Sequence, residues 1–290
     1  MDVSIVIVNY NTKELTTNCI KSIFEHTSGC EFEIILVDNA SQDGSKEIFE
    51  SMPGIRYIYN DKNAGFGTAN NIGAKVAKGK YFFLLNSDTL LIENSIKILF
   101  DHMEQNPQLS LCGANLVNGD RQNSIIGGQF PSLLSEFAAI GFYKLNRKYH
   151  NRNIAICQTI DQLGDNTLQY VSGANMFFRA DVFNQLGGFD ESFFMYYEET
   201  DLCKRFTSQG YKLALVPKTT IVHLEGQSTG NQISLKKYQI INRSKMHFYR
   251  KHHSRLYLWA VKFCEFMKVV IRPYYYKKDY FILLADVFRM

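Results

Sequence analysis

A carboxylate-bearing turn after an apolar run is the first feature of this 290-residue sequence that could do chemistry. The run Tyr81–Leu85 is followed at once by Asn86-Ser87-Asp88. Mg²⁺ and Mn²⁺ prefer oxygen ligands and are commonly held by one or two carboxylates together with phosphate oxygens. The turn is therefore a candidate site for a metal and a phosphate, although the same residues would also suit a cap before the next helix.

Polar clusters follow three more apolar runs nearer the N-terminus. They are Asn9-Tyr10-Asn11 after Val3–Val8, Asp38–Ser41 after Phe32–Val37, and Asn60–Asn63 after Ile55–Tyr59. Asn and Asp are common in turns, so turn chemistry explains any single cluster equally well. If the runs are parallel strands, however, their carboxyl ends meet at the edge where α/β sheets bind ligands. Four clusters at one such edge predict a nucleotide-binding site.

The elements that must position these residues can be read from the spacing of apolar side chains. Helical spacing occurs at about 12–26, 44–52 and 66–77, between the four apolar runs, and at about 94–105 after the last of them. Strands that are apolar throughout and separated by helices predict a mostly parallel α/β sheet with helices on both faces. Regular patterning resumes at 170–179, a helix is expected at 198–209, and two short strands are expected at 212–216 and 220–223. Residues 118–168 have weak periodicity, and we expect a variable insertion there.

Several function classes are disfavoured by missing patterns. The first apolar run lacks a GxGxxG turn, Gly65-Phe66-Gly67 lacks the third glycine, and the sequence has no GxxxxGK[ST] loop, which disfavours dehydrogenases and P-loop enzymes. Six scattered cysteines without a CxxC pair disfavour a zinc cluster or a disulfide framework. With no signal-peptide pattern and no charge-free window of 18 residues, we expect a cytoplasmic protein without a spanning helix.

Taken together, the polar motifs resemble those of the family 2 glycosyltransferases of GT-A fold, and rhamnosyltransferase-like members in particular. The resemblance covers roughly residues 3–230, and its motifs occur in the family's order. The motifs that carry it are Val8–Asn11, Val37–Ser45, Asn63–Gly67 with Asn70-Asn71, Leu85–Thr89, Gly173-Ala174, Gly187–Glu191, Phe194–Arg205, His223 and Ser228-Thr229.

The resemblance implies an inverting transferase that moves a sugar, with rhamnose among the candidates, from a nucleotide-diphosphate donor to an acceptor hydroxyl. The donor would be dTDP- or UDP-linked, and the acceptor a glycan or lipid-linked glycan in cell-surface polysaccharide or glycolipid synthesis. Asn86-Ser87-Asp88 looks like the family's DxD motif with Asn in its first position, so Asp88 is the expected ligand to Mg²⁺ or Mn²⁺, and His223 would complete the site. The resemblance implies nucleotide-binding roles for Val8, Asn9, Tyr10, Asp38, Asn71, Asn86 and Ser87.

The segment Glu198–Asp201 looks like the family's ED motif, which implies that Glu199 is the general base, although many members have Asp there. Glu198, Asp201, Gly173 and Ala174 are then expected as supporting or acceptor-side residues. Alternatively, these acids stabilise the positive end of the helix they open, and Asp201 pairs with Arg205 one turn on. A single base suffices for direct displacement with inversion, whereas glycoside hydrolysis needs two flanking carboxylates.

Two alternative functions fit the sequence less well. A sugar-nucleotide pyrophosphorylase would be expected to carry a glycine-rich basic loop after the first strand, where this chain has Asn9-Tyr10-Asn11. A non-catalytic protein that binds a nucleotide sugar or a glycan would have no need to keep Asp88, Glu199 and His223 together.

The C-terminal part of the chain differs from the rest in charge. Residues 235–290 carry 13 Lys and Arg against three acids, a net of +10, whereas residues 1–234 have a net of −6. We expect a catalytic domain at 1–230 and a basic, aromatic-rich helical extension at 231–290 that packs on it through an apolar stripe. Peripheral contact with an anionic membrane is the second interpretation, and nucleic-acid binding is not expected. The stripe consists of Leu256, Trp259, Ala260, Phe263, Met267, Val270 and Ile271.

Overall fold

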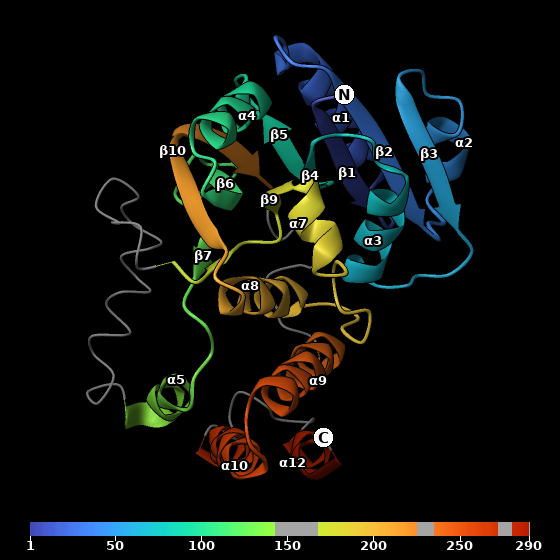
Figure 1. The fold of residues 1–290 in the computed structure, drawn as a ribbon. Helices are drawn as coiled ribbons and strands as arrows, with labels where there is room; N and C mark the ends of the chain where they lie inside the picture. The colour runs from blue at the N-terminus through green and yellow to red at the C-terminus, as the bar shows by residue number, and fades with distance from the viewer. Residues whose placement is uncertain (143–167, 225–234, 272–279, 290) are drawn as a thin grey trace.

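An eight-stranded sheet forms the centre of the fold in the computed structural model (Figure 1), which describes residues 1–142, 168–224, 235–271 and 280–289. The order of its strands is β3-β2-β1-β4-β9-β6-β10-β5, and β7 pairs with β8 in a small second sheet. The strands are β1 (Val3–Asn9), β2 (Phe32–Asn39), β3 (Ile55–Asn60), β4 (Tyr81–Asn86), β5 (Thr89–Leu91), β6 (Leu109–Val117), β7 (Gly127–Gly128), β8 (Tyr170–Val171), β9 (Asn175–Arg179) and β10 (Lys212–His223).

The first four strands run parallel, so their carboxyl ends share one edge of the sheet. In the register of the sheet, Val8 of β1 lies opposite Val37 of β2 and Asn86 of β4, and Asp38 of β2 lies opposite Tyr59 of β3. β9 is antiparallel to β4 and β6, and β5 is antiparallel to β10, which makes the sheet mostly parallel. The predicted shared edge of polar clusters is thereby confirmed.

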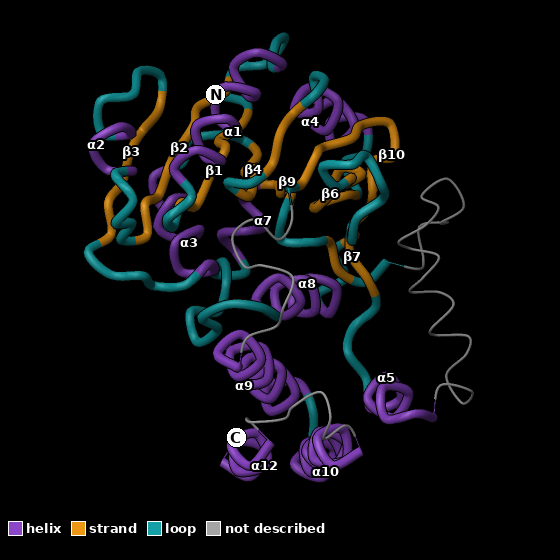
Figure 2. Tube along the Cα trace, turned by 180° about the vertical axis from the view of Figure 1, so that it is seen from behind, coloured by secondary structure: helices purple, strands orange, loops and turns teal. Residues whose placement is uncertain are grey.

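Helices cover both faces of the sheet (Figures 1 and 2). On one face, Ile5 and Ile7 join a core with α1 (Lys13–His26), α2 (Ser45–Phe49) and α4 (Ser95–Gln105). Val6, between them, joins a second core with α3 (Phe66–Val76), α7 (Ala180–Gln185) and α8 (Glu198–Ser208). Burial on both faces explains why the central strands are apolar at most positions, and the predicted α/β class is confirmed.

The structure differs from the expected elements in the second half of the sheet. Residues 212–223 form one strand, β10, rather than two, with a register shift against β6 between Val216 and Thr220. Pro217 lies in this shift, where a missing N–H costs no ladder bond. The region expected as an insertion contains α5 (Leu133–Phe137) and a short π-helical turn, η1 (Ala138–Phe142). Residues 143–167 of that region and Ser228-Thr229 lie outside the described residues.

In the described residues after the sheet, three helices lie at the end of the molecule opposite to it: α9 (Leu235–His252), α10 (Arg255–Ile271) and α12 (Tyr280–Arg289) (Figures 1 and 2). Phe193 packs in a buried cluster with residues of α9 and α10, which joins the extension to the loop before α8. The expected helical extension is therefore present. The expected boundary at residues 230 and 231 falls outside the described residues and stays a prediction. Among the described residues, no helix combines the length and the apolar composition that crossing a bilayer requires.

The apolar stripe of α10 does not make the packing contact expected of it. Leu256, Trp259 and Phe263 are exposed, and the buried side of α10 instead carries Val261, Cys264, Glu265 and Val269. Glu265 can be buried because Lys245 and Lys268 pair with its carboxylate. A spacing rule that assigns charged residues to the solvent side therefore selects the wrong face of this helix.

Candidate active site

The turn after β4 and the end of β10 bring Asp88 and His223 together. Antiparallel pairing of β5 with β10 sets His223 opposite Thr89, and the backbone N–H of Leu224 donates to the carbonyl oxygen of Asp88 at 2.8 Å. Asp88 Oδ1 lies 3.2 Å from His223 Nε2. Two ligands about 2.1 Å from an octahedral cation lie about 3.0 Å apart. The spacing of these two atoms therefore suits a shared Mg²⁺ or Mn²⁺.

Asn86 supplies a third polar group beside this pair. Its Nδ2 lies 3.5 Å from His223 Nε2, and its buried Oδ1 has no hydrogen-bond partner among the described residues. Because buried oxygens normally have a partner, the pair's surroundings fit an additional ligand or cation. No cluster of three or more His, Cys, Asp and Glu side chains suited to a metal occurs in the described parts of the chain. A cation here would thus be completed by other oxygens, such as those of a diphosphate.

The side chains at the ends of β1 and β2 are largely bonded to each other. Asn9 Nδ2 donates to Ser41 Oγ at 2.9 Å, and Asn9 Oδ1 accepts from the hydroxyls of Thr12, just before α1, and Thr16, in its first turn. Fully buried Asp38 accepts from the backbone N–H of Ser41 at 2.9 Å and from Tyr57 Oη at 3.0 Å. Asn9 and Asp38 therefore shape the edge, whereas Tyr10 is exposed at it.

The other residues expected at the nucleotide site divide between the edge and the helices. Half-buried Val8 packs with the apolar cluster under the edge, and Ser87 Oγ lies 3.1 Å from Thr12 Oγ1. Asn71 instead joins α3 to the turn before α8. Its Nδ2 donates to the carbonyl oxygen of Phe189 at 2.9 Å, and its Oδ1 accepts from the N–H of the same residue at 2.9 Å. A nucleotide-binding role for Asn71 stays a prediction that none of these contacts supports.

Gly173 and Ala174 connect the Asn86–Asp88 turn to the helix that begins with the Glu198–Asp201 motif. The carbonyl oxygen of Ala174 accepts from the backbone N–H of Asn86 at 3.0 Å. Gly173 lies against Glu199, since a Cβ at this glycine would be 3.7 Å from Glu199 Cβ. The Asn86–Asp88 turn and Glu199, more than a hundred positions apart in sequence, are thus both contacted by two adjacent residues.

Burial changes the acidity of the two glutamates. It raises the pKa of Glu199, although backbone hydrogen bonds and the Thr200 hydroxyl, which donates to Oε1 at 3.0 Å, oppose the shift. Burial and the neighbouring Glu199 raise the pKa of Glu198 well above its ordinary value. Glu198 Oε2 has no hydrogen-bond partner within the described part of the chain. A raised pKa brings a carboxylate closer to the range in which a general base works best at neutral pH.

Residues with strained backbone conformations lie in the loops that carry the expected site motifs. Of the five non-glycine residues with positive φ in the described ranges, four lie in the expected site motifs: Asn11, Ala40, Tyr196 and Tyr197. Tyr196 and Tyr197 directly precede Glu198 and both have φ of 68°. Such residues cost about 1–3 kcal/mol each and persist where the surroundings hold them, often at functional sites. Here Ser244 of α9 donates to the carbonyl oxygen of Met195 at 2.7 Å.

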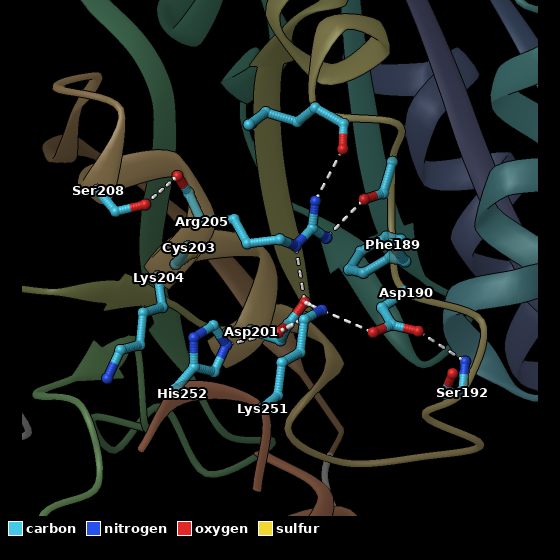
Figure 3. A network of polar contacts seen from close by, with 12 residues as sticks. Phe189, Asp190, Ser192, Asp201, Cys203, Lys204, Arg205, Ser208, Lys251 and His252 are labelled. Carbon is cyan, nitrogen blue, oxygen red and sulfur yellow. Dashed lines mark hydrogen bonds and ion pairs between the residues drawn. The ribbon is translucent and has the colours of Figure 1, made fainter. Parts of the chain in front are cut away.

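Asp201 is the centre of a polar network between α8 and α9 (Figure 3). Its buried carboxylate contacts Arg205 Nε at 2.8 Å, His252 Nε2 at 2.7 Å and Lys251 Nζ at 2.9 Å. Burial alone would raise the pKa of Asp201, but hydrogen bonds from His252, Lys251 and Arg205 lower it. The expected pairing with Arg205 is confirmed, and Asp201 supports the helix that carries Glu199. The contributions of Lys251 and His252 were missed because no motif marks them, about fifty positions away.

The sequence matches the family model of glycosyl transferase family 2 over residues 4–187, more than half of the chain. The chain belongs to this family. The family 2 enzyme is 27% identical over 212 residues to N-acetylglucosaminyl-diphospho-decaprenol L-rhamnosyltransferase of Mycobacterium tuberculosis, covering 68% of each chain. It is 26% identical over 236 residues to rhamnosyltransferase WbbL of Escherichia coli K12, covering 76% of this chain and 83% of the relative.

Solved structures show the same fold. TarS of S. aureus, residues 1–349, has a TM-score of 0.56 at 13% identity, covering 100% of this chain and 89% of that chain. GalNAc-T7 with UDP, GalNAc and Mn²⁺ has a TM-score of 0.57 at 18% identity, covering 86% of this chain and 50% of that chain. The expected GT-A fold is confirmed. The family 2 enzyme is a glycosyltransferase, and the pyrophosphorylase and non-catalytic alternatives are not supported.

Proposed function

We propose that this family 2 enzyme is an inverting, cation-dependent transferase that moves a sugar from a nucleotide-diphosphate donor to the hydroxyl of a lipid-linked or glycan acceptor. The observation that carries the proposal is the junction at Gly173-Ala174, which contacts Glu199 on one side and the Asn86–Asp88 turn on the other. Rhamnose is the first candidate sugar because both relatives described above are named rhamnosyltransferases. The name of the mycobacterial relative also supports a lipid-diphosphate acceptor in cell-surface glycan synthesis.

The polar edge of the sheet is the proposed site for the dTDP or UDP part of the donor. Tyr10 is exposed and would be accessible to the nucleotide. The side chains of Asn9 and Asp38 are buried, so Asp38 and the backbone around Val8 and Asn9 would contact the base only after the side chains that cover them move slightly. The diphosphate would lie at Asn86–Asp88. A Mg²⁺ or Mn²⁺ ion held by Asp88 and His223 would neutralise the charge that develops on the leaving diphosphate.

Glu199 is the proposed general base. Its carboxylate would accept the proton of the acceptor hydroxyl as that oxygen attacks the anomeric carbon, an effect worth about 10²–10⁴ in rate. With one base and no covalent intermediate, the displacement inverts the anomeric configuration. Burial raises the pKa of both Glu198 and Glu199, and two adjacent buried carboxylates do not both ionise readily. The Thr200 hydroxyl donates to Glu199 Oε1, whereas Glu198 Oε2 has no hydrogen-bond partner among the described residues, which favours the charge on Glu199.

We place the enzyme in the cytoplasm, at the inner face of the cell membrane. The net charge of +10 in residues 235–290 favours attraction to anionic lipid. A lipid-linked acceptor, which the name of the mycobacterial relative supports, would be found at the same surface.

The proposal is tested by assaying transfer from dTDP- and UDP-sugars with Mn²⁺ and with a chelator, and by determining the anomeric configuration of the product by NMR. We expect transfer only with the cation, and inversion. Asp88→Asn should lose cation-dependent nucleotide binding, whereas Asp120→Asn, at an exposed loop, should keep it. Full activity in chelator, or a product with retained configuration, would overturn the mechanism.

A further inference from the structure

The exposed side of α10 is an apolar stripe of large side chains. Leu256, Trp259 and Phe263 are 81%, 66% and 57% exposed, and Val270 and Ile271 near the end of the helix are also exposed. Spacings of three, four and seven positions set Leu256, Trp259, Phe263 and Val270 on one face of the helix. Large apolar side chains gathered in this way on a surface mark an interaction site.

The stripe lies at an end of the molecule where a flat partner could reach it. Both views show α10 and α12 side by side, at the end opposite the sheet (Figures 1 and 2). Ile282 of α12 is 47% exposed, which adds a further apolar side chain on the neighbouring helix. With 17 residues, α10 is about 25 Å long, and it would lie along a surface over that length.

Positive charge borders the stripe. Arg255 and Lys262 are seven positions apart and so lie along the same edge of α10, and Lys262 Nζ lies 5.5 Å from the ring centroid of Trp259. The acids of the described extension are already bonded: Glu265 is buried with Lys245 and Lys268, and Asp286 accepts from Gln239 at 2.5 Å. Long cationic side chains beside apolar ones can keep their charge in water while their stems cover apolar surface.

We propose that α10 is an interfacial helix that docks on an anionic lipid bilayer, with Leu256, Trp259 and Phe263 among the acyl chains and Arg255 and Lys262 at the headgroups. The inference rests on the proposed function for the membrane contact of residues 235–290 and names the face that makes it. A basic amphipathic helix with Trp, Phe and Leu on its apolar side suits this position. A second copy of the chain would instead bring two cationic edges together, which disfavours a dimer through this face.

The single tryptophan of the chain, Trp259, reports on docking directly. We expect its fluorescence to shift to shorter wavelength with vesicles of phosphatidylcholine and phosphatidylglycerol, and to be quenched when the acyl chains are brominated. Vesicles of phosphatidylcholine alone should bind more weakly, and added salt should weaken binding to the anionic vesicles. Unchanged Trp259 emission with anionic vesicles, whether or not the protein sediments with them, would overturn the proposal.

A double variant that keeps the tryptophan tests the stripe itself. Leu256→Ser with Phe263→Ser should weaken vesicle binding by about tenfold or more, with an unchanged circular dichroism spectrum and unchanged transfer to a soluble acceptor. Ile125→Ser, at a residue of similar exposure (56%) outside the extension, should bind as the parent does. Equal binding by the double variant would contradict the proposal. A parent enzyme that elutes as a dimer and a double variant that elutes as a monomer in size-exclusion chromatography would also contradict it. Vesicle binding by a protein without transferase activity would refute the proposed function while supporting this inference.

Discussion

Replacing Asp201 with asparagine should destabilise the contact between α8 and α9. The carboxylate is fully buried and is contacted by Arg205, Lys251 and His252 at 2.7–2.9 Å. Asparagine has nearly the same size, but it lacks the negative charge and one of the acceptor oxygens. The variant therefore leaves three cationic or polar donors around a neutral group, with little change in packing.

The expected loss is about 3 kcal/mol of unfolding free energy, because removing one partner of a buried ion pair costs about 3–5 kcal/mol. We take the lower end of this range because Arg205 and Lys251 keep other hydrogen-bond acceptors in the variant. Arg205 also donates to two backbone carbonyl oxygens, and Lys251 Nζ lies 2.6 Å from Asp190. For a chain of this size, this loss corresponds to a decrease in Tm of about 6 °C.

Urea unfolding followed by circular dichroism measures the loss, and Asp101→Asn provides a matched control. Asp101 also pairs with a base one helical turn away, Lys97, but both side chains are partly exposed, so the control should lose at most about 0.5 kcal/mol. The pKa of Asp201 is lowered in the folded state, so its stabilising effect is present above the unfolded value of about 3.9 and is lost as the pH falls through the folded value. The difference between wild type and Asp201→Asn should thus shrink below about pH 4. Equal losses in the two variants at pH 7 would refute the role given to Asp201.

Three further predictions concern the site. Because burial raises the pKa of Glu199, kcat should rise with pH along an acidic limb centred above the ordinary glutamate value of about 4.3, and a limb at or below it would contradict the assignment. Gly65→Ala should lower thermal stability by about 2 kcal/mol or more and lower kcat, because φ is +87° and the new Cβ would lie 2.2 Å from the carbonyl oxygen of Phe194. Gly187→Ala, at φ +74° with open space, should cost only about 1 kcal/mol, and equal losses would exclude the clash as the cause. Asn86→Asp should lower the half-saturating Mn²⁺ concentration about fivefold, the equivalent of about 1 kcal/mol of added charge attraction, and an unchanged value would place Asn86 outside the cation site.

The arrangement of the sheet edge could be predicted because it follows from local patterns. Short runs that are apolar at most positions favour strands buried on both faces, which is typical of parallel strands covered by helices. Once the strands are parallel, the polar residues after them must share an edge, as the pairing of Val8 with Val37 and Asn86 shows. The roles expected of these residues came from the resemblance to the family's motifs and their order, because sheet geometry alone assigns no roles.

The contacts between distant segments could not be predicted in the same way. No spacing rule connects Asp201 to Lys251 and His252, since these residues meet only through the packing of α9 on α8. The stripe of α10 posed a different difficulty, because a packed helix and an interfacial helix show the same apolar periodicity. The packed face of α10 was concealed in the sequence by Glu265, whose burial depends on Lys245 from another helix.

The transfer rate of Glu199→Gln, measured alongside the affinity for the nucleotide-sugar donor with Mn²⁺, tests the central claim most directly. Glutamine keeps the size of the side chain but cannot accept the proton of the acceptor hydroxyl. We predict that kcat falls by about 10²–10⁴ while the donor Kd changes by less than about twofold. Turnover equal to that of the parent enzyme, with donor binding intact, would show that Glu199 is not the base.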